Sequence, residues 1–150
     1  MKRNKYIFSL MFVVVIVYTA YYISTHYVQL ALIQGDSMLP SYHNMQIVLV
    51  DRQYKALERD DVVLFKCDGL NSILIKRIVA VPGDMLTAVN GKMQVNSTMT
   101  DIPWDTAENI SIRLADDEFF VVGDNYGASV DSRSDEVGIV DVGNIIGKVF

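Results

Sequence analysis

Hydrophobic and polar positions divide the chain into two parts with different patterns. Residues 6–23 form a run without a charge, and three of the first five residues are basic. As a helix this run is about 27 Å long at roughly 1.5 Å per residue, close to the hydrocarbon thickness of a bilayer. Because basic flanks stay on the cytoplasmic side, we expect a cytoplasmic segment 1–5, a transmembrane anchor 6–27 and an exported domain 28–150.

A cleavable export signal is the alternative interpretation of this N-terminal pattern, because export signals also have a charged start followed by an apolar stretch. The run is longer than such signals usually are, and no clean small-x-small site ends it. Both features favour an uncleaved anchor. The pattern therefore predicts a single-pass protein of the cell membrane, with its N-terminus in the cytoplasm and its folded part outside.

Beyond residue 30 the pattern changes to short β-branched and aromatic runs divided by Gly, Asp, Asn and Pro. The runs that predict strands are 45–50, 62–65, 73–81, 85–89, 93–95, 119–122 and 145–150. Asn90-Gly91 lies between two of them and is typical of a tight hairpin turn. We therefore expect a mainly β, short-stranded antiparallel domain, with a less regular acidic excursion over 96–117.

Charge and composition narrow the function classes. The net charge is -5, so the chain lacks the basic face that nucleic-acid binding requires. Cys67 is the only cysteine and cannot form an intramolecular disulfide; it is expected to be a small residue near a strand end. The sequence has no metal-ligand spacing and no cofactor motif. We expect no metal, no cofactor and no nucleic acid, and the oligomeric state stays unknown.

Three segments have unusual local composition, and the first follows the anchor directly. In residues 35–40 a serine, Ser37, lies in a turn bounded by Gly35 and Pro40. Glycine permits close backbone approach, and proline restricts the chain beyond it. A serine in such a turn is usually a hydrogen-bonding loop residue, so this segment alone does not indicate catalysis.

The second segment is the apolar run 73–81, which two adjacent bases interrupt. Because side chains alternate along a strand, Lys76 shares a face with Leu74, Ile78 and Ala80, and Arg77 lies on the other face. A lysine has an ordinary pKa of about 10.4, and burial can lower it by roughly 3 to 5 units. Lys76 is then a general base; the alternative is an edge-strand lysine whose amine reaches water.

The third segment, 121–133, is a strand that runs into a loop rich in short polar side chains. Such a loop can fix a backbone and orient a neighbouring group. A Ser/His/Asp arrangement is the rival chemistry, but the chain has only His26, at the expected membrane surface, and His43, which has no evident orienting partner.

Taken in order behind a single span, these segments resemble the bacterial type I signal peptidases that use a Ser/Lys pair. Residues 35–40 resemble the nucleophile motif, 61–66 the second strand motif, 76–84 the lysine motif, and 123–138 the last motif. The resemblance covers nearly the whole chain, in the compact form found in Gram-positive bacteria. It implies a serine endopeptidase that removes signal peptides from secretory preproteins at Ala-x-Ala sites beside the lipid bilayer.

The resemblance also implies roles for individual residues. Ser37 corresponds to the nucleophile and Lys76 to the general base. Ser129 corresponds to a residue that hydrogen-bonds the lysine amine, while Asp131 and Arg133 form a pair that holds the loop.

Further roles concern the substrate and the oxyanion. The nucleophile's own N–H and a group two residues earlier meet the oxyanion in the family; here that earlier residue is Gly35, so we expect backbone donation from Ser37 and Gly35. Ile33, Met38 and Ile75 correspond to walls of the shallow pockets for small side chains.

Two positions depart from the family pattern. Tyr126 stands where the last motif usually has Arg, and Asp60 stands where the second strand motif usually opens with Gly. Two other functions stay open. One is a catalytically silent relative that binds export or surface-fibre substrates; the other is a self-cleaving repressor of the related fold, which the apolar span and the acidic charge oppose.

Overall fold

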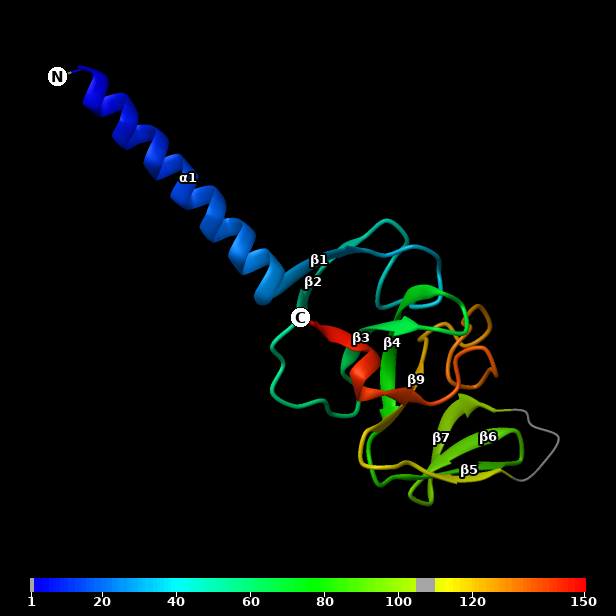
Figure 1. Cartoon of the computed structure of the whole chain (residues 1–150). Coiled ribbons are helices and arrows are strands. Elements are labelled where there is room, and N and C mark those ends of the chain that lie inside the picture. The colour runs from blue at the N-terminus through cyan, green and yellow to red at the C-terminus, as the bar shows by residue number, and fades with distance from the viewer. Residues whose placement is uncertain (1, 105–109) are drawn as a thin grey trace.

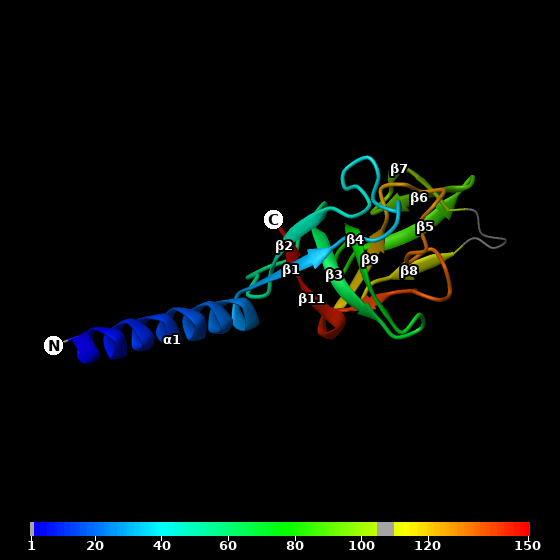
Figure 2. The same ribbon diagram turned by 90° about the horizontal axis from the view of Figure 1, so that it is seen from above.

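The computed structural model describes residues 2–104 and 110–150, as one long helix and a body of antiparallel strands (Figure 1). Helix α1, Lys2–His26, projects away from the strands in both ribbon views (Figures 1 and 2). Its stretch Lys5–Ile23 has a mean hydropathy of 2.0 and is not buried against the rest of the molecule. The helix is thus long and apolar enough to cross a membrane. Position 1 of the expected cytoplasmic segment lies outside the described residues.

The larger sheet has seven strands in the order β1-β2-β11-β3-β4-β9-β10, all antiparallel to their neighbours. The strands are β1 Val28–Leu32, β2 Ile47–Asp51, β3 Val62–Cys67, β4 Ser72–Ala80, β9 Glu118–Val122, β10 Val140–Asp141 and β11 Ile145–Val149, with a 3-10 turn η1 Val142–Asn144 before the last. The predicted mainly β, antiparallel fold is therefore confirmed. Cys67 is the last residue of β3 and is buried.

A smaller four-stranded sheet has the order β7-β6-β5-β8 and lies at the end of the body away from α1 (Figures 1 and 2). Its strands are β5 Met85–Val89, β6 Lys92–Val95, β7 Thr98–Pro103 and β8 Ser111–Arg113. Strands β7 and β8 fall in the excursion 96–117, so the expectation of irregular structure there is wrong in part. Both strands are mostly exposed and polar, so they lack the apolar alternation that marks a strand in a sequence.

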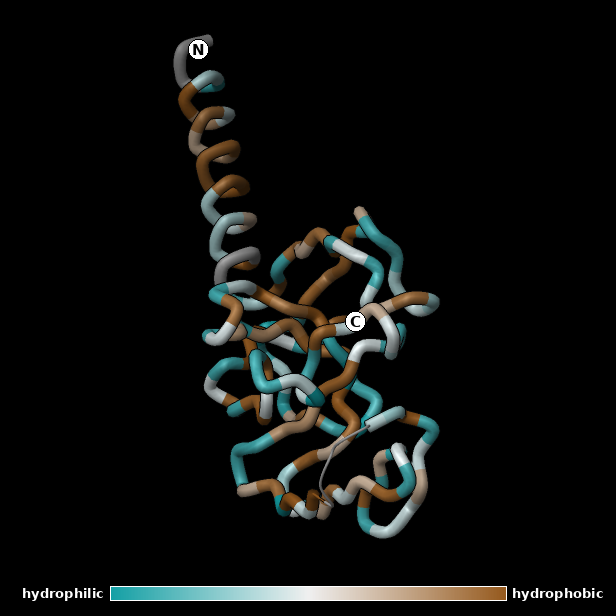
Figure 3. Tube along the Cα trace, turned by 90° about the vertical axis from the view of Figure 1, so that its right-hand side faces the viewer, coloured by the Kyte–Doolittle hydropathy of each residue, from teal (hydrophilic) through white to brown (hydrophobic). Residues whose placement is uncertain are grey.

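Three apolar clusters fill the body. One joins the small sheet to the ends of β4 and β9, one packs beneath β1 and β2, and one lies around β3, β9 and β10. Figure 3 shows apolar stretches running through the strands, as well as along the first half of the helix. The strand β1 itself was not predicted, because it follows the weakly polar end of the anchor, is short and includes the polar Gln29, so it shows no clear apolar run.

Pairing along β4 changes halfway, and this change positions the site. On one edge, β4 pairs with β3 over residues 72–77. On the other edge it pairs with β9 only from Arg77 onward. Strand β1, at the end of the sheet, pairs with β2 alone within the described chain. Residues 72–76 and strand β1 therefore each present an unpaired backbone edge.

Candidate active site

Strand β4 carries a buried lysine at the centre of the site. Lys76 pairs with Val63 of β3, and only 3% of its surface is exposed. By strand alternation it shares a face with Leu74 and Ile78, which pack in one apolar cluster. The expectation that Ala80 shares this face is wrong: the ladder to β9 is irregular between Ile78 and Ala80, and Ala80 packs into another cluster.

Ser37 lies in the turn after β1, and contacts on two sides hold this turn. Met38 is buried in the cluster under β1 and β2. The Asn125 N–H donates to the Ser37 carbonyl at 2.9 Å, and the Asn125 amide donates to the Asp36 carbonyl at 3.0 Å. Ser37 Oγ and Lys76 Nζ are then 2.7 Å apart, a hydrogen-bond distance. The structure thus brings together two residues that are 39 positions apart.

Burial sets the charge state of the lysine. It lowers the pKa of the Lys76 ammonium below its ordinary value, while the negative charges of Asp131 and Asp124 act in the opposite direction. A lowered pKa increases the neutral fraction near neutral pH, and only the neutral amine can accept a proton. In the neutral state the hydroxyl of Ser37 donates to the Lys76 amine.

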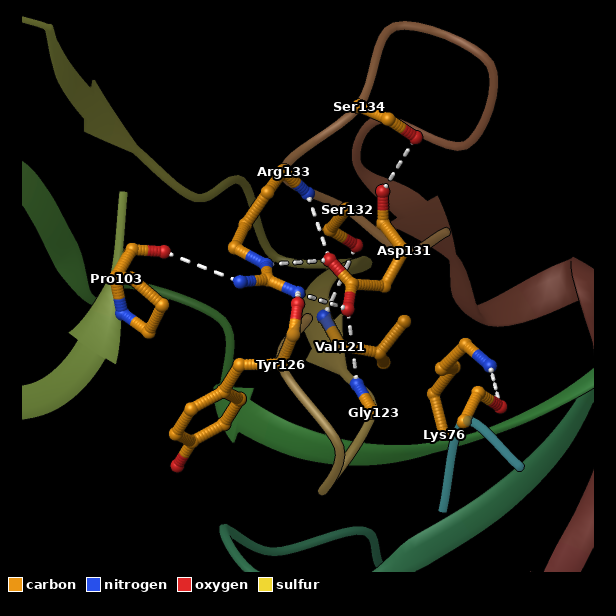
Figure 4. Close-up of polar contacts among 10 residues, drawn as sticks. Lys76, Pro103, Val121, Gly123, Tyr126, Asp131, Ser132, Arg133 and Ser134 are labelled. Atoms are coloured by element: carbon orange, nitrogen blue, oxygen red, sulfur yellow. Dashed lines mark hydrogen bonds and ion pairs between the residues drawn. The ribbon is translucent and has the colours of Figure 1, made fainter. Parts of the chain in front are cut away.

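Asp131 and Arg133 form the expected ion pair in the loop after β9. Arg133 Nε and Nη2 donate to the two carboxylate oxygens at 2.8 Å each, and the Gly123 N–H donates to the same carboxylate at 3.0 Å (Figure 4). Burial acts to raise the pKa of Asp131, but these donors hold it below its ordinary value. The carboxylate therefore stays ionised at neutral pH.

Tyr126, which replaces the usual arginine, contacts this ion pair. The guanidinium carbon of Arg133 lies 5.7 Å from the centre of the Tyr126 ring, within the range of a cation–π interaction. Arg133 Nη2 also donates to the Tyr126 carbonyl at 2.9 Å. The departure at this position thus supplies an aromatic contact to the arginine that pairs with Asp131.

Ser129 makes no hydrogen bond to the lysine in this structure. Its hydroxyl oxygen is buried without a partner among the described residues, although the hydroxyl helps to lower the pKa of the nearby Asp131 carboxylate. A β-carbon on Gly123 would collide with this hydroxyl and with the carbonyl of Ser37. The bare backbone of Gly123 therefore lets the Ser37 turn approach the Ser129 loop, a packing role that no sequence pattern indicated.

Arg77 was not predicted as a site residue. Its guanidinium donates to both carboxylate oxygens of Asp124, at 2.8 and 2.6 Å, and to the carbonyl of Asp60 at 2.7 Å. It joins the end of β9 to the turn before β3, on the face of β4 opposite Lys76. The signal in the sequence was a second cation in an apolar strand, which needs a counter-charge when it is partly buried.

The oxyanion donors are only partly as expected. Among the residues that the structure describes, no acceptor takes the N–H of Ser37. The N–H of Gly35, by contrast, donates to Asn44 Oδ1 at 3.0 Å. Gly35 has a φ of +90°, which favours glycine at this point of the turn. Its N–H can meet an oxyanion only after the hydrogen bond to Asn44 is exchanged.

A cleft of about 260 Å³ opens beside the Ser37–Lys76 pair. It lies between β1 and the first half of β4, where both strands have unpaired edges. Ile33 and Ile75, two of the predicted pocket walls, line it. Met38 does not line the cleft, because it is buried in the core near Ser37.

The chain combines an apolar helix, an antiparallel β body and a close contact between Ser37 and Lys76. Comparison with known families identifies the class of protein to which it belongs. The family model described as "Signal peptidase, peptidase S26" matches residues 4–150. This chain belongs to that family.

Individual relatives are more distant. Signal peptidase I S of Bacillus subtilis (strain 168) is 29% identical over 120 residues, which are 68% of this chain and 64% of that protein. The probable signal peptidase I-2 of Synechocystis sp. is 29% identical over 131 residues, 79% of this chain and 59% of the relative. The chain therefore spans less than two thirds of the length of these relatives.

A solved structure supports the fold. The crystal structure of a signal peptidase I from Enterococcus faecalis V583 superposes with a TM-score of 0.52 at 18% identity. The superposition covers 65% of this chain and 100% of that chain. At this identity the likeness concerns the fold alone, so the chemistry is argued from the site.

Proposed function

We propose that this protein is a membrane-bound serine endopeptidase that removes signal peptides from exported preproteins. The observation that carries the proposal is the 2.7 Å contact between Ser37 Oγ and the amine of Lys76, a lysine with 3% of its surface exposed. A buried lysine beside a serine hydroxyl is a general base beside a nucleophile. Membership in the signal peptidase family supports the substrate class.

The reaction is an acyl transfer in two halves. The neutral amine of Lys76 takes the proton of the Ser37 hydroxyl while Oγ attacks the carbonyl carbon of the scissile peptide bond. The Lys76 ammonium then gives this proton to the leaving amine, and the C–N bond breaks. In the second half, Lys76 takes a proton from water while the water oxygen attacks the ester carbonyl. The bond between the acyl carbon and Ser37 Oγ then breaks, the Lys76 ammonium returns the proton to Oγ, and the carboxylic acid product leaves.

Hydrogen-bond donors near Ser37 stabilise the negatively charged oxygen that forms in both halves of the reaction. The N–H of Ser37 is one donor, because it has no other acceptor among the described residues. The N–H of Gly35 is the second, after it releases Asn44. Asp131 and Arg133 hold the loop that carries Ser129 against Gly123, and in this proposal Ser129 orients the Lys76 amine when substrate is bound.

The substrate is an extended segment that occupies the cleft between β1 and β4. Both strands have an unpaired edge there, so a peptide strand can be added to the sheet. Ile33 and Ile75 narrow the cleft next to Ser37 and select small side chains, as in Ala-x-Ala sites. Helix α1 spans the membrane with its N-terminus in the cytoplasm, and the catalytic domain lies outside.

The test is processing of a preprotein with an Ala-x-Ala site by the full chain in detergent. Ser37→Ala and Lys76→Ala are expected to reduce cleavage at least 1000-fold, because each removes an essential partner of the acyl transfer. Lys66→Ala and Ser111→Ala are matched controls, since both residues are exposed and lie outside the cleft. The controls should cleave at the parental rate.

Two results would reject this function. If both dyad variants cleave as fast as the parent, Ser37 and Lys76 are not the catalytic pair. If the parent binds preproteins without cleaving them, the chain is the catalytically silent relative that the sequence left open.

A further inference from the structure

The cleft has a polar side chain at the end far from Ser37. Gln29 lies in β1, lines the cleft and is half-buried. It pairs with Val50 of β2, which is fully buried, so both side chains lie on the inner face of the sheet. Ala31 and Ile33 follow on this same face by strand alternation. Gln29 thus stands where an apolar residue would extend the core.

The Gln29 amide is not used by the fold. Within residues 2–104 and 110–150, its side chain makes no hydrogen bond. A half-buried amide has two donors and an acceptor whose hydrogen bonds are costly to leave unmade. Its neighbours on this wall of the cleft are the side chains of Ala31 and Ile33, which cannot form a hydrogen bond with the amide. A ligand in the cleft is therefore the available partner.

Strand spacing fixes which substrate residue reaches Gln29. This step rests on the proposed function, in which the last residue before the scissile bond lies beside Ile33 and Ser37. Extended chains advance about 3.3 Å per residue, and directly paired residues place their side chains on the same face. The third residue before the bond then faces Ala31, and the fifth faces Gln29.

The membrane helix fixes the direction of the substrate. Gln29 is three residues past the end of α1, so this end of the cleft lies next to the membrane surface. A signal peptide is the apolar part of the preprotein on the N-terminal side of the scissile bond. Its chain therefore enters the cleft from the Gln29 end and reaches Ser37 with its last residue.

We infer that Gln29 is a specificity-determining residue that selects a polar side chain at the fifth position before the cleavage site. A polar residue there satisfies the Gln29 amide. An apolar residue desolvates the amide without replacing its hydrogen bonds, so it is rejected. The membrane-embedded apolar part of the signal peptide is thereby kept from sliding further into the cleft, which sets the point of cleavage.

The test uses two preproteins with the same Ala-x-Ala site that differ only at the fifth residue before the bond, Ser in one and Leu in the other. The parent should cleave the Ser substrate with a kcat/KM roughly tenfold higher than that of the Leu substrate. Gln29→Leu should bring this ratio to one or below. Gln53→Leu is the matched control, since Gln53 is exposed and outside the cleft, and it should keep the parental ratio.

A second variant guards against loss of folding. Gln29→Glu keeps an acceptor and adds a negative charge, so it should favour a substrate with Lys at the fifth position over the Ser substrate. An unchanged ratio in both Gln29 variants, with cleavage still dependent on Ser37, overturns the inference and leaves the proposed function intact. If the parent cleaves neither substrate, the proposed function fails and this inference fails with it.

Discussion

At the scale of single residues, the site depends on one amine whose pKa burial lowers, next to carboxylates that are paired with arginines. Lys76 has two carboxylates nearby, and both raise its pKa, yet burial outweighs them. An arginine balances the negative charge of each carboxylate: Arg133 pairs with Asp131, and Arg77 pairs with Asp124. The lysine is therefore left without a direct ion-pair partner among the described residues, and its hydrogen bond goes to Ser37.

The pH dependence of the rate follows from this arrangement. The neutral fraction of Lys76 rises as the pH rises through its pKa, and that pKa lies below the ordinary value of 10.5. The kcat/KM for a soluble peptide should therefore rise about tenfold per pH unit and level off below pH 10.5. A profile measured between pH 6 and about 11 checks this. A rate that keeps rising through 10.5 would contradict the burial of the amine.

Asp60 supports a prediction about stability. Its φ is +72°, in the left-handed region that side chains disfavour, and its carbonyl accepts from Arg77. Asp60→Gly keeps the carbonyl and relieves the strain, so it should raise the free energy of unfolding by about 0.5–1 kcal/mol. Urea midpoints measure the change. The control is Asp68→Gly, at a turn residue whose own φ is not positive, where glycine should not stabilise.

At the scale of elements, the site forms where the turn after β1 meets the loop after β9. Asn125 donates to the carbonyls of Asp36 and Ser37, and Gly123 leaves room for this contact. Two segments more than 80 residues apart in the chain are thus joined through backbone groups, as the separation of 89 positions between Asn125 and Asp36 illustrates.

Glycine substitutions separate this contact from general loop effects. Gly123→Ala places a methyl group against the Ser129 hydroxyl and the Ser37 carbonyl, so Ser37 must shift. A displacement of a nucleophile by about 1 Å lowers the reaction rate roughly 100-fold, so we expect kcat to fall by this order. Gly127→Ala in the same loop meets no atom within 4 Å and should retain parental kcat. Equal rates for the two variants would mean that the contact is unimportant.

The sequence predicted the strands that alternate or are uniformly apolar, and it placed Lys76 on an apolar face. It could not predict β7 and β8, because exposed strands owe their pairing to neighbours rather than to their own pattern. It also could not reveal that Arg77 binds Asp124 or that Asn44 accepts from the Gly35 N–H, because Asp124 and Asn44 lie in other turns of the chain. The Ser37 role came from the family resemblance, and local composition gave no sign of it.

At the scale of the whole molecule, the chain is a β body carried on one apolar helix. The helix projects from the body of strands in the ribbon views (Figure 2). Its stretch Lys5–Ile23 is apolar and is not buried inside the described part of the molecule. Anchoring and chemistry are therefore expected to be separable.

Charges placed in the helix test this separation. Val13→Asp with Val17→Asp adds two charges to the span, each costing about 2.5–3.5 kcal/mol at a bilayer centre. The variant should be lost from the membrane fraction, cleave a soluble peptide at the parental rate and cleave a membrane-embedded preprotein much more slowly. Val13→Leu with Val17→Leu is the control. Equal loss on both substrates would show that the helix also supports the fold.

The change of pairing along β4 has one more consequence. Among the described residues, no strand pairs with one edge of β4 over residues 72–76, whereas β9 pairs with this edge from Arg77 onward, where Val122 is the first partner. A peptide strand lying along this edge meets the end of β9 beside Lys76 and has to turn out of the sheet there. Under the proposed function, the peptide bond at this bend is the one that reaches Ser37, so the end of β9 limits how far the substrate can enter before it is cut.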